Sequence, residues 1–269
     1  MHYVFDVDGT LSFDVDGTLS FDVDGTLSFD GKKIARPIVN ALKSLELSGH
    51  TVSFASARPI RDLVPIVPDF SDGHLLIGGN GSIVKTIDDE IKLANPIDSK
   101  SFDSIKHVIN KYQLNYIVDD SWNYSAKINT TNKIYKQLDP DNLAKNVNLE
   151  TIYEPIKIIL VNIPQSIFND LLEKLQSASN LAIVAHSGEN SIDITAAEIN
   201  KFNTLQQYYQ NEYYAFGNDS NDFELLSHAK ISVWVGGNNE RLKQLDLTPS
   251  IIVSRSINDV STIIEHLNV

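Results

Sequence analysis

Asp6 and Asp8 stand in the segment Asp-Val-Asp-Gly-Thr, which directly follows a short apolar run of the chain. A strand over 2–5 would bring both carboxyls to the carboxyl end of a sheet, where open α/β folds bind their ligands. A carboxylate there can attack phosphorus, and a carboxyl two residues on can protonate the leaving oxygen and then activate water. The segment alone is equally compatible with an Asp-Gly turn between two strands.

The segment belongs to an octapeptide, Phe-Asp-Val-Asp-Gly-Thr-Leu-Ser, that fills residues 5–28 three times without a spacer. The repeat offers three candidate carboxyl pairs, Asp6/Asp8, Asp14/Asp16 and Asp22/Asp24. A central parallel strand is buried on both faces and favours a continuous apolar run. Residues 3–5 form such a run before the first pair, whereas a serine interrupts the run before each of the later pairs. The first copy is favoured for this reason, whereas the third lies closer in sequence to the helix expected over 36–48.

The two later copies predict a β-hairpin. Residues 11–15 and 19–23 alternate between apolar and polar types around Asp16-Gly17, and Asp-Gly between alternating strands is a strong hairpin signal. The apolar stripe of this hairpin needs cover, and an uncovered stripe invites association with a second chain. Self-association through the hairpin is therefore an expectation.

Three further segments could complete a site for a phosphoryl group. Ser56 follows a strand expected over 51–55, where its hydroxyl and the neighbouring amides can hold a phosphoryl oxygen. Lys201 can neutralise charge on the nucleophile and on the phosphoryl group. The segment 217–222 offers carboxylates to a hard cation such as Mg²⁺, which proteins bind through few carboxylates plus substrate oxygens and water. Taken singly, Lys201 is more simply interpreted as a surface lysine, and the segment 217–222 as an Asn/Asp-rich turn before a helix.

The elements that must position these residues alternate between strand and helix at both ends of the chain. Strands are expected over 2–5, 51–55, 75–77, 213–216, 231–235 and 251–253, with helices over 36–48, from Pro59, after 222 and over 260–267. This alternation predicts an α/β fold whose core is a Rossmann-like, doubly wound parallel sheet with helices on both faces.

The middle of the chain has a different pattern. Helices are expected over 102–112 and 167–175, and strands over 116–118, 156–163 and 181–185, with few residues suited to chemistry. We predict a small α+β domain over 83–187, inserted into a core formed by 1–82 and 188–269.

Composition excludes several classes of function. The chain has 269 residues, a formal net charge of −13 and no cysteine, so disulfides and thiolate metal sites are excluded. No Lys/Arg cluster tracks a phosphate backbone, which argues against nucleic acid, and no apolar run is long enough to cross a bilayer. No secretory signal is visible, and a cytoplasmic location is the default expectation.

Together these segments resemble the haloacid dehalogenase-like hydrolase superfamily, specifically its Cof-type phosphatases with an inserted α+β (type IIB) cap domain. The resemblance covers nearly the whole chain. It implies that Asp6 is the nucleophile and Asp8 the acid and base, and that Ser56 and Lys201 hold the phosphoryl group. Residues 77–82 look like the family's junction into the cap, and Arg58 looks like the arginine of its Thr-Gly-Arg segment.

The fourth motif departs from the family pattern Gly-Asp-x-x-Asn-Asp. Residues 217–222 read Gly-Asn-Asp-Ser-Asn-Asp, so Asn218 stands where the usual first carboxylate would be. An amide oxygen can bind Mg²⁺ but lacks the charge, and Asp219 is the alternative first ligand. Asn221 and Asp222 align without adjustment, Asn221 as a phosphate-binding residue and Asp222 as a metal ligand.

The resemblance implies a Mg²⁺-dependent phosphatase that hydrolyses small phosphorylated metabolites through an aspartyl-phosphate. Asp6 and Asp8, the latter through its main-chain carbonyl, complete the implied metal ligands. Sugar phosphates and phosphorylated cofactors are the implied substrates. Two alternatives remain open: a catalytically impaired repeat-expansion variant that acts as a binding or regulatory protein, and a phosphotransferase.

Overall fold

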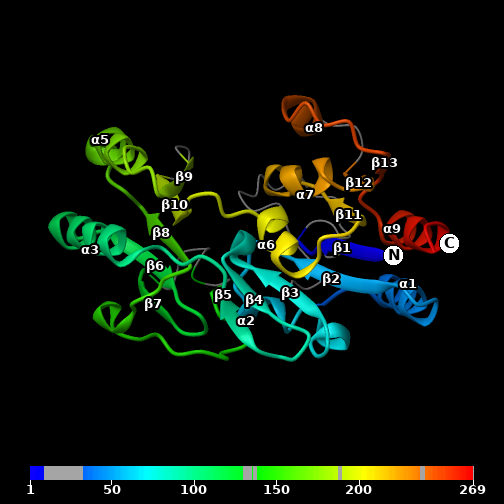
Figure 1. Ribbon diagram of the computed structural model, residues 1–269. Coiled ribbons are helices and arrows are strands. Elements are labelled where there is room, and N and C mark those ends of the chain that lie inside the picture. Colours follow the sequence, from blue (N-terminus) through cyan, green and yellow to red (C-terminus); the bar gives the residue numbers. More distant parts are fainter. Residues whose placement is uncertain (9–32, 130–134, 136–137, 187–189, 237–239, 269) are drawn as a thin grey trace.

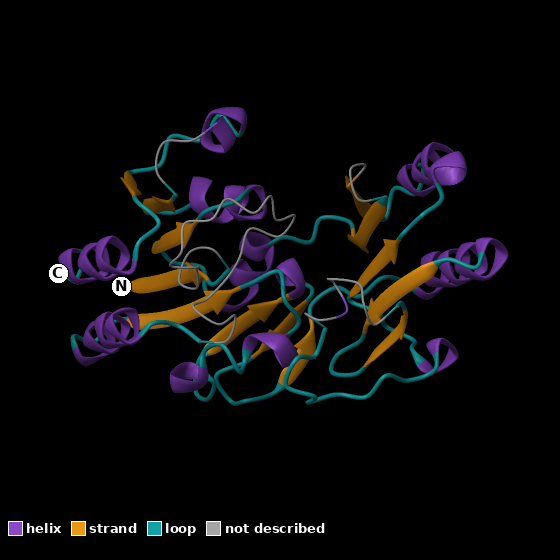
Figure 2. Cartoon of the chain, turned by 180° about the vertical axis from the view of Figure 1, so that it is seen from behind, coloured by secondary structure: helices purple, strands orange, loops and turns teal. Residues whose placement is uncertain are grey.

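The computed structural model describes residues 1–8, 33–129, 135, 138–186, 190–236 and 240–268. The described strands form two sheets, one of eight strands and one of five, which lie side by side (Figures 1 and 2). The predicted hairpin of the later repeat copies lies outside the described residues.

The larger sheet has the strand order β13-β12-β11-β1-β2-β3-β4-β5. Its strands are β1 (His2–Asp6), β2 (Thr51–Ala55), β3 (Leu75–Gly78), β4 (Ile83–Lys85), β5 (Ile91–Leu93), β11 (Tyr213–Gly217), β12 (Ile231–Val235) and β13 (Ile251–Val253). The strands from β13 to β3 are parallel, and β4 and β5 add an antiparallel edge. The strand order reverses at β1 and β11, and ligands of such sheets bind beside the carboxyl ends at this point.

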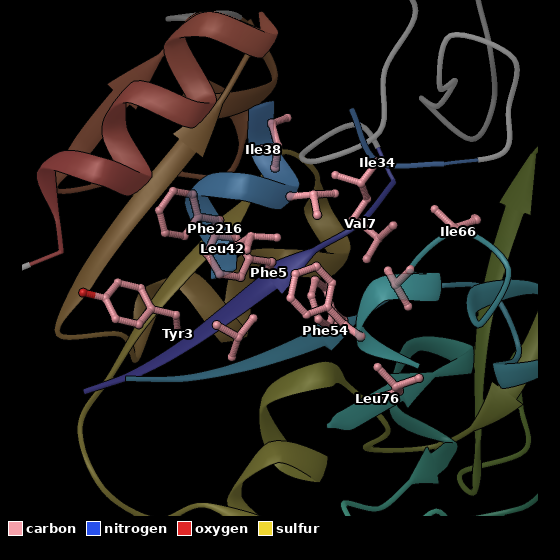
Figure 3. Close-up of a cluster of buried hydrophobic side chains, with 14 of the residues drawn as sticks. Tyr3, Phe5, Val7, Ile34, Ile38, Leu42, Phe54, Ile66, Leu76 and Phe216 are labelled. Atoms are coloured by element: carbon pink, nitrogen blue, oxygen red, sulfur yellow. The ribbon is translucent and has the colours of Figure 1, made fainter. Parts of the chain in front are cut away.

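Helices cover both faces of this sheet. The helices of the core are α1 (Arg36–Leu47), α2 (Ile60–Leu63), α6 (Lys201–Tyr208), α7 (Phe223–Ser227), α8 (Glu240–Gln244) and α9 (Ile257–His266). Tyr3 and Phe5 of β1 share one apolar cluster with Ile38 and Leu42 of α1, part of which Figure 3 shows. Val4 points to the opposite cluster, where α6 and α7 pack. Alternate residues of β1 are thus buried on opposite faces, and the predicted α/β fold with its doubly wound parallel sheet is confirmed.

The smaller sheet is antiparallel, with the order β7-β6-β8-β10-β9. Its strands are β6 (Asn115–Asp119), β7 (Tyr124–Lys127), β8 (Lys157–Val161), β9 (Leu181–His186) and β10 (Ser191–Ala196). Apolar residues of α3 (Ser99–Tyr112) and α5 (Gln165–Gln176) pack on one face of it and form a second core. Short 3-10 helices at 68–70, 79–81, 149–151 and 220–222 complete the described elements.

The predicted boundaries at 82/83 and 187/188 do not coincide with the change of sheet. β4 and β5, which were expected in the inserted domain, extend the edge of the larger sheet, and β10, which was expected in the core, pairs with β8 and β9. The reason is that β4 and β5 have three residues each, too few to show which sheet they join, while β10 continues antiparallel pairing that began earlier in the chain.

A buried arginine joins the two sheets. Arg61 of α2 is fully buried and donates to both carboxylate oxygens of Asp62, to Asp119 at the end of β6 (2.9 Å) and to the main-chain oxygen of Trp122 (2.9 Å).

No helix in the described part of the chain is long and apolar enough to span a membrane.

Candidate active site

The central strand of the larger sheet, β1, runs into the first repeat copy and ends with its Phe5 and Asp6. β1 pairs with β2 and β11, with Phe5 opposite Phe54 and Phe216, so Asp6 comes at the carboxyl end of the sheet. In Figures 1 and 2 this end points towards the smaller sheet. Of the three candidate pairs, Asp6 and Asp8 lie among the described residues, and the pairs of the second and third copies lie outside them.

Lys201 lies between two buried carboxylates. Its Nζ is 2.5 Å from Asp6 Oδ1 and 2.7 Å from Asp222 Oδ1, and Lys201 and Asp222 have no exposed surface. Lys201 is the first residue of α6, whose N-terminus is capped by the side chain of Asn200. A fully buried lysine is rare unless it is paired, and here the two carboxylates provide the pairing.

Burial and charge act against each other on these groups. Burial, followed by the charge of Asp222, raises the pKa of Asp6 well above its usual range, and Lys201 opposes this rise. Burial alone would lower the pKa of Lys201, but the charges of Asp222 and Asp6 outweigh it and raise the pKa above its ordinary value. The ammonium is therefore held in its charged form between the two carboxyls.

Asp8 is held by two donors from the loop after β2. Ser56 donates its hydroxyl to Asp8 Oδ2 (2.6 Å), and Arg58 donates Nε–H to Asp8 Oδ1 (2.8 Å). The main-chain amide of Arg58 in turn donates to the Ser56 hydroxyl oxygen (3.0 Å). The sequence prediction placed Ser56 at the site, and Arg58 entered it only through the resemblance.

The loop at 217–222 is wound tightly around Asp222. Asp222 Oδ2 accepts from the main-chain amides of Asn218 (2.9 Å) and Asp219 (3.1 Å). A Cβ on Gly217 would come within 2.6 Å of the Asp222 Cβ, so only glycine fits there without displacing the loop. Asp219 uses its side chain to cap the short helix that follows, and it accepts from the amide of Ser220.

Asn218, rather than Asp219, faces the nucleophile. One terminal atom of its side-chain amide lies 3.1 Å from Asp6 Oδ2 and 2.9 Å from the Asp8 main-chain oxygen. With nitrogen in this place the amide donates to both oxygens. With oxygen in this place the amide oxygen faces two other oxygens, an arrangement that a cation makes favourable.

The second orientation of Asn218 fits Mg²⁺. Adjacent ligands of an octahedral Mg²⁺ with bonds of 2.0–2.1 Å lie about 2.9 Å apart, close to the two distances found here. Within the described residues no three His, Asp or Glu side chains converge on one metal position. A cation here would thus use one carboxylate, one amide and one main-chain oxygen.

Asn221 connects the loop to the segment that leaves β3. Its side-chain nitrogen donates to Asn80 Oδ1 (3.0 Å), and the main-chain amide of Asn80 donates to the Ser56 main-chain oxygen (3.0 Å). Asn80 has φ +57° between two glycines that also have positive φ. Sequence reasoning did not place Asn80 in the site, although Gly79-Asn80-Gly81 is the kind of turn sequence that could have signalled it.

A model of the haloacid dehalogenase-like hydrolase family matches residues 19–247. The match begins two residues before the third repeat copy, although Phe5 and Asp6 of the first copy lie in the sheet. No curated protein is similar enough in sequence to give a match.

Several solved structures share the fold over nearly the full length of both chains. A protein from Thermotoga maritima is 19% identical with a TM-score of 0.78, covering 99% of this chain and 97% of that one. A HAD-superfamily phosphatase from Bacteroides thetaiotaomicron is 18% identical, with a TM-score of 0.71 and coverage of 98% and 94%. A HAD subclass IIB sugar phosphatase is 19% identical, with a TM-score of 0.66 and coverage of 98% of each chain.

The family match extends over most of the chain, and the solved structures share the fold over nearly its full length. The chain belongs to the haloacid dehalogenase-like hydrolases.

Proposed function

We propose that this chain is a Mg²⁺-dependent phosphatase that hydrolyses small phosphomonoesters through an aspartyl-phosphate on Asp6. The observation that carries the proposal is the position of Lys201 Nζ between Asp6 Oδ1 and Asp222 Oδ1, with Asp8 two residues on from Asp6. A buried carboxylate beside a fixed ammonium can approach a phosphate dianion, because the ammonium offsets the repulsion between the two anions.

In the first step Asp6 Oδ1, the oxygen that Lys201 contacts, attacks phosphorus, while Oδ2 stays on the side of Asn218. The bond from phosphorus to the ester oxygen breaks, and Asp8 in its acid form gives its proton to that oxygen, so the alcohol leaves neutral. Both oxygens of Asp8 are engaged by Ser56 and Arg58, so Asp8 must release one of them to reach the ester oxygen. We assign to the freed Ser56 hydroxyl a contact with a phosphoryl oxygen.

In the second step Asp8, now a carboxylate, takes a proton from water. The water oxygen bonds to phosphorus, the bond between phosphorus and Asp6 breaks, and inorganic phosphate is released with Asp6 restored. Asn221, which is tied to Asn80 beside Ser56, stays in the proposal as a residue of the phosphate-binding loop.

A bound Mg²⁺ would offset negative charge on the phosphoryl oxygens. Asp6 Oδ2, the Asp8 main-chain oxygen and the Asn218 amide oxygen would hold it. Asp219 caps its own helix, and the oxygens of Asp222 are engaged by Lys201 and two amides. We therefore propose that Asp222 positions Lys201 and the loop.

Sugar phosphates are the substrate class we propose first, because one neighbour in fold is described as a sugar phosphatase. Phosphorylated cofactors are the second class. The test is phosphate release from an aryl phosphate, a hexose phosphate and pyridoxal phosphate, with Mg²⁺, with excess chelator and with Mg²⁺ restored. We expect release that the chelator abolishes and Mg²⁺ restores, and absence of release from all three would contradict the proposal.

The alternative of a catalytically impaired variant has one observation in its favour, because the family match begins near the third copy. Removal of residues 5–20 leaves one copy after residues 1–4. If the full chain is inactive and the shortened chain releases phosphate, the repeat disables the site.

A further inference from the structure

A cavity of about 550 Å³ lies at the amino ends of β1, β2 and β3. Its wall includes His2 of β1, Thr51 and Val52 of β2 and Leu75 of β3. In Figures 1 and 2 the N-terminus marks this end of the sheet, which points away from the smaller sheet. Small-molecule sites have volumes of roughly 300–1,000 Å³, so the cavity can hold a ligand of moderate size.

The cavity is separate from the site around Asp6. β1 has His2 at the cavity and Asp6 at its other end, four residues further on, which corresponds to about 13 Å of extended strand. α6 begins at Lys201 and brings Tyr208 to the cavity at its last residue, about 10 Å along the helix. A molecule in the cavity therefore lies beyond reach of the catalytic carboxyls.

One wall of the cavity is aromatic. The ring of His2 stacks on the ring of Tyr209, with centroids 4.1 Å apart and an angle of 19° between the planes. Tyr208 and Ile87 also line the cavity and are 39% and 62% exposed. Exposed apolar surface beside a stacked ring pair favours a planar ligand, which can bury its faces against these side chains.

His2 also has a polar atom without a partner. Its Nδ1 lies 2.6 Å from the Thr51 hydroxyl oxygen, whereas its buried Nε2 makes no hydrogen bond within the described residues. A buried ring nitrogen without a partner costs free energy, and a hydrogen bond from a ligand would remove that cost.

The charges around the cavity disfavour an anion. Burial lowers the pKa of His2 to about 4, so this ring is neutral at pH 7. Lys92 is already paired with Glu90 (2.7 Å), the N-terminal ammonium contacts His50 (3.2 Å), and Glu46 lies 2.6 Å from His74. Asp88 adds negative charge to the wall. The formal net charge of −13 also repels anions at long range.

We propose that this cavity binds an uncharged planar heterocycle of nucleoside size, stacked beside His2 and Tyr209 and hydrogen-bonded to His2 Nε2. Such a ligand carries no phosphoryl group and does not need the site of Asp6. The proposal is therefore independent of the proposed phosphatase function.

The test is calorimetric titration of the full chain with adenosine and with uridine, together with NMR of the His2 imidazole. We expect saturable binding of at least one nucleoside, tighter than about 1 mM, and a change in the His2 Nε2 resonance on binding. Tyr209→Ala should weaken binding about tenfold, the loss typical of one stacking partner.

Tyr112→Ala is the control, because it also removes a tyrosine ring but Tyr112 ends α3 beside the smaller sheet, away from the cavity. Asp6→Asn should leave nucleoside binding unchanged, which separates this site from the catalytic one. The proposal is overturned if neither nucleoside binds at millimolar concentration, or if binding leaves the His2 resonance in place. Equal loss of affinity in Tyr209→Ala and Tyr112→Ala would also overturn it.

Discussion

Lys201 Nζ lies 2.5 Å from Asp6 Oδ1, although 194 residues of the chain separate the two in sequence. Because Lys201 also bonds Asp222, the three side chains form one buried cluster with two carboxyls and one ammonium. The two elements that bring the first two residues together are β1, which ends at Asp6, and α6, which begins at Lys201. The cluster thus depends on the core fold as a whole.

Lys201→Met should lower the stability of the protein. Removing the ammonium leaves two buried carboxyls without their counter-charge, which costs about 3–5 kcal/mol in comparable buried pairs. Urea unfolding measures the change. Lys230→Met is the control, because the Lys230–Glu212 pair is exposed and should contribute at most about 1 kcal/mol. Equal stability of the two variants would show that Lys201 and Asp6 are not paired as described.

Gly217→Ala should reduce activity by displacing Asp222. The added methyl would come within 2.6 Å of the Asp222 Cβ, and such overpacking typically costs 1–3 kcal/mol. Gly73→Ala is the control, because Gly73 has positive φ but no atom within 4 Å of its added Cβ. We expect Gly73→Ala to lower stability only and Gly217→Ala to lower phosphate release as well. Full activity of Gly217→Ala would contradict the tight loop around Asp222.

His2 should make the protein less stable in mild acid. The folded state keeps His2 neutral down to a pKa of about 4, whereas the unfolded chain takes up a proton near the usual value of 6.5. The unfolded state therefore binds more protons between these values. The stabilisation is fully present above pH 6.5 and is lost as the pH falls towards 4.

His2→Phe should remove this pH dependence, since phenylalanine keeps a ring beside Tyr209 but binds no proton. Between pH 7 and pH 4.5 the wild-type chain should lose about 2–3 kcal/mol more unfolding free energy than the variant. His107→Phe on the exposed side of α3 is the control. The prediction fails if wild type and His2→Phe lose stability in parallel.

Arg61 and Asp119 should show a strong coupling across the two sheets. A double-mutant cycle of Arg61→Met and Asp119→Asn, followed by urea unfolding, should give a coupling energy of about 1–3 kcal/mol, since both groups are buried and 2.9 Å apart. A coupling energy near zero would mean that this pair does not join the sheets.

Much of the core and of the site follows from short-range patterns. Ser56 comes directly after a buried strand, and Asp6 ends one, so the carboxyl-end position of both could be predicted from the alternation of strands and helices. Arg61 could not be predicted, because its burial depends on Asp119, 58 residues away, and a sequence shows an arginine as a surface residue. The strands β4 and β5 were missed because three residues each are too few to show a strand periodicity.

The repeat limits prediction for a different reason. Its period of eight is even, so a slip by one copy leaves every side chain on its original face of the sheet. Local pattern therefore separates the copies only by the residues that precede them. Tyr3 and Val4 precede only the first copy, and both are fully buried in β1, so they distinguish this copy from the other two.

The central claim is that Asp6 of the first copy is the nucleophile. The direct measurement is the rate of phosphate release, with Mg²⁺ present, by three variants: Asp6→Asn, Asp14→Asn and Asp22→Asn. We predict that Asp6→Asn loses at least about 1,000-fold in kcat while the other two keep the wild-type rate within a few-fold. A loss of activity in Asp22→Asn with activity retained in Asp6→Asn would contradict the claim and place the third copy at the active site.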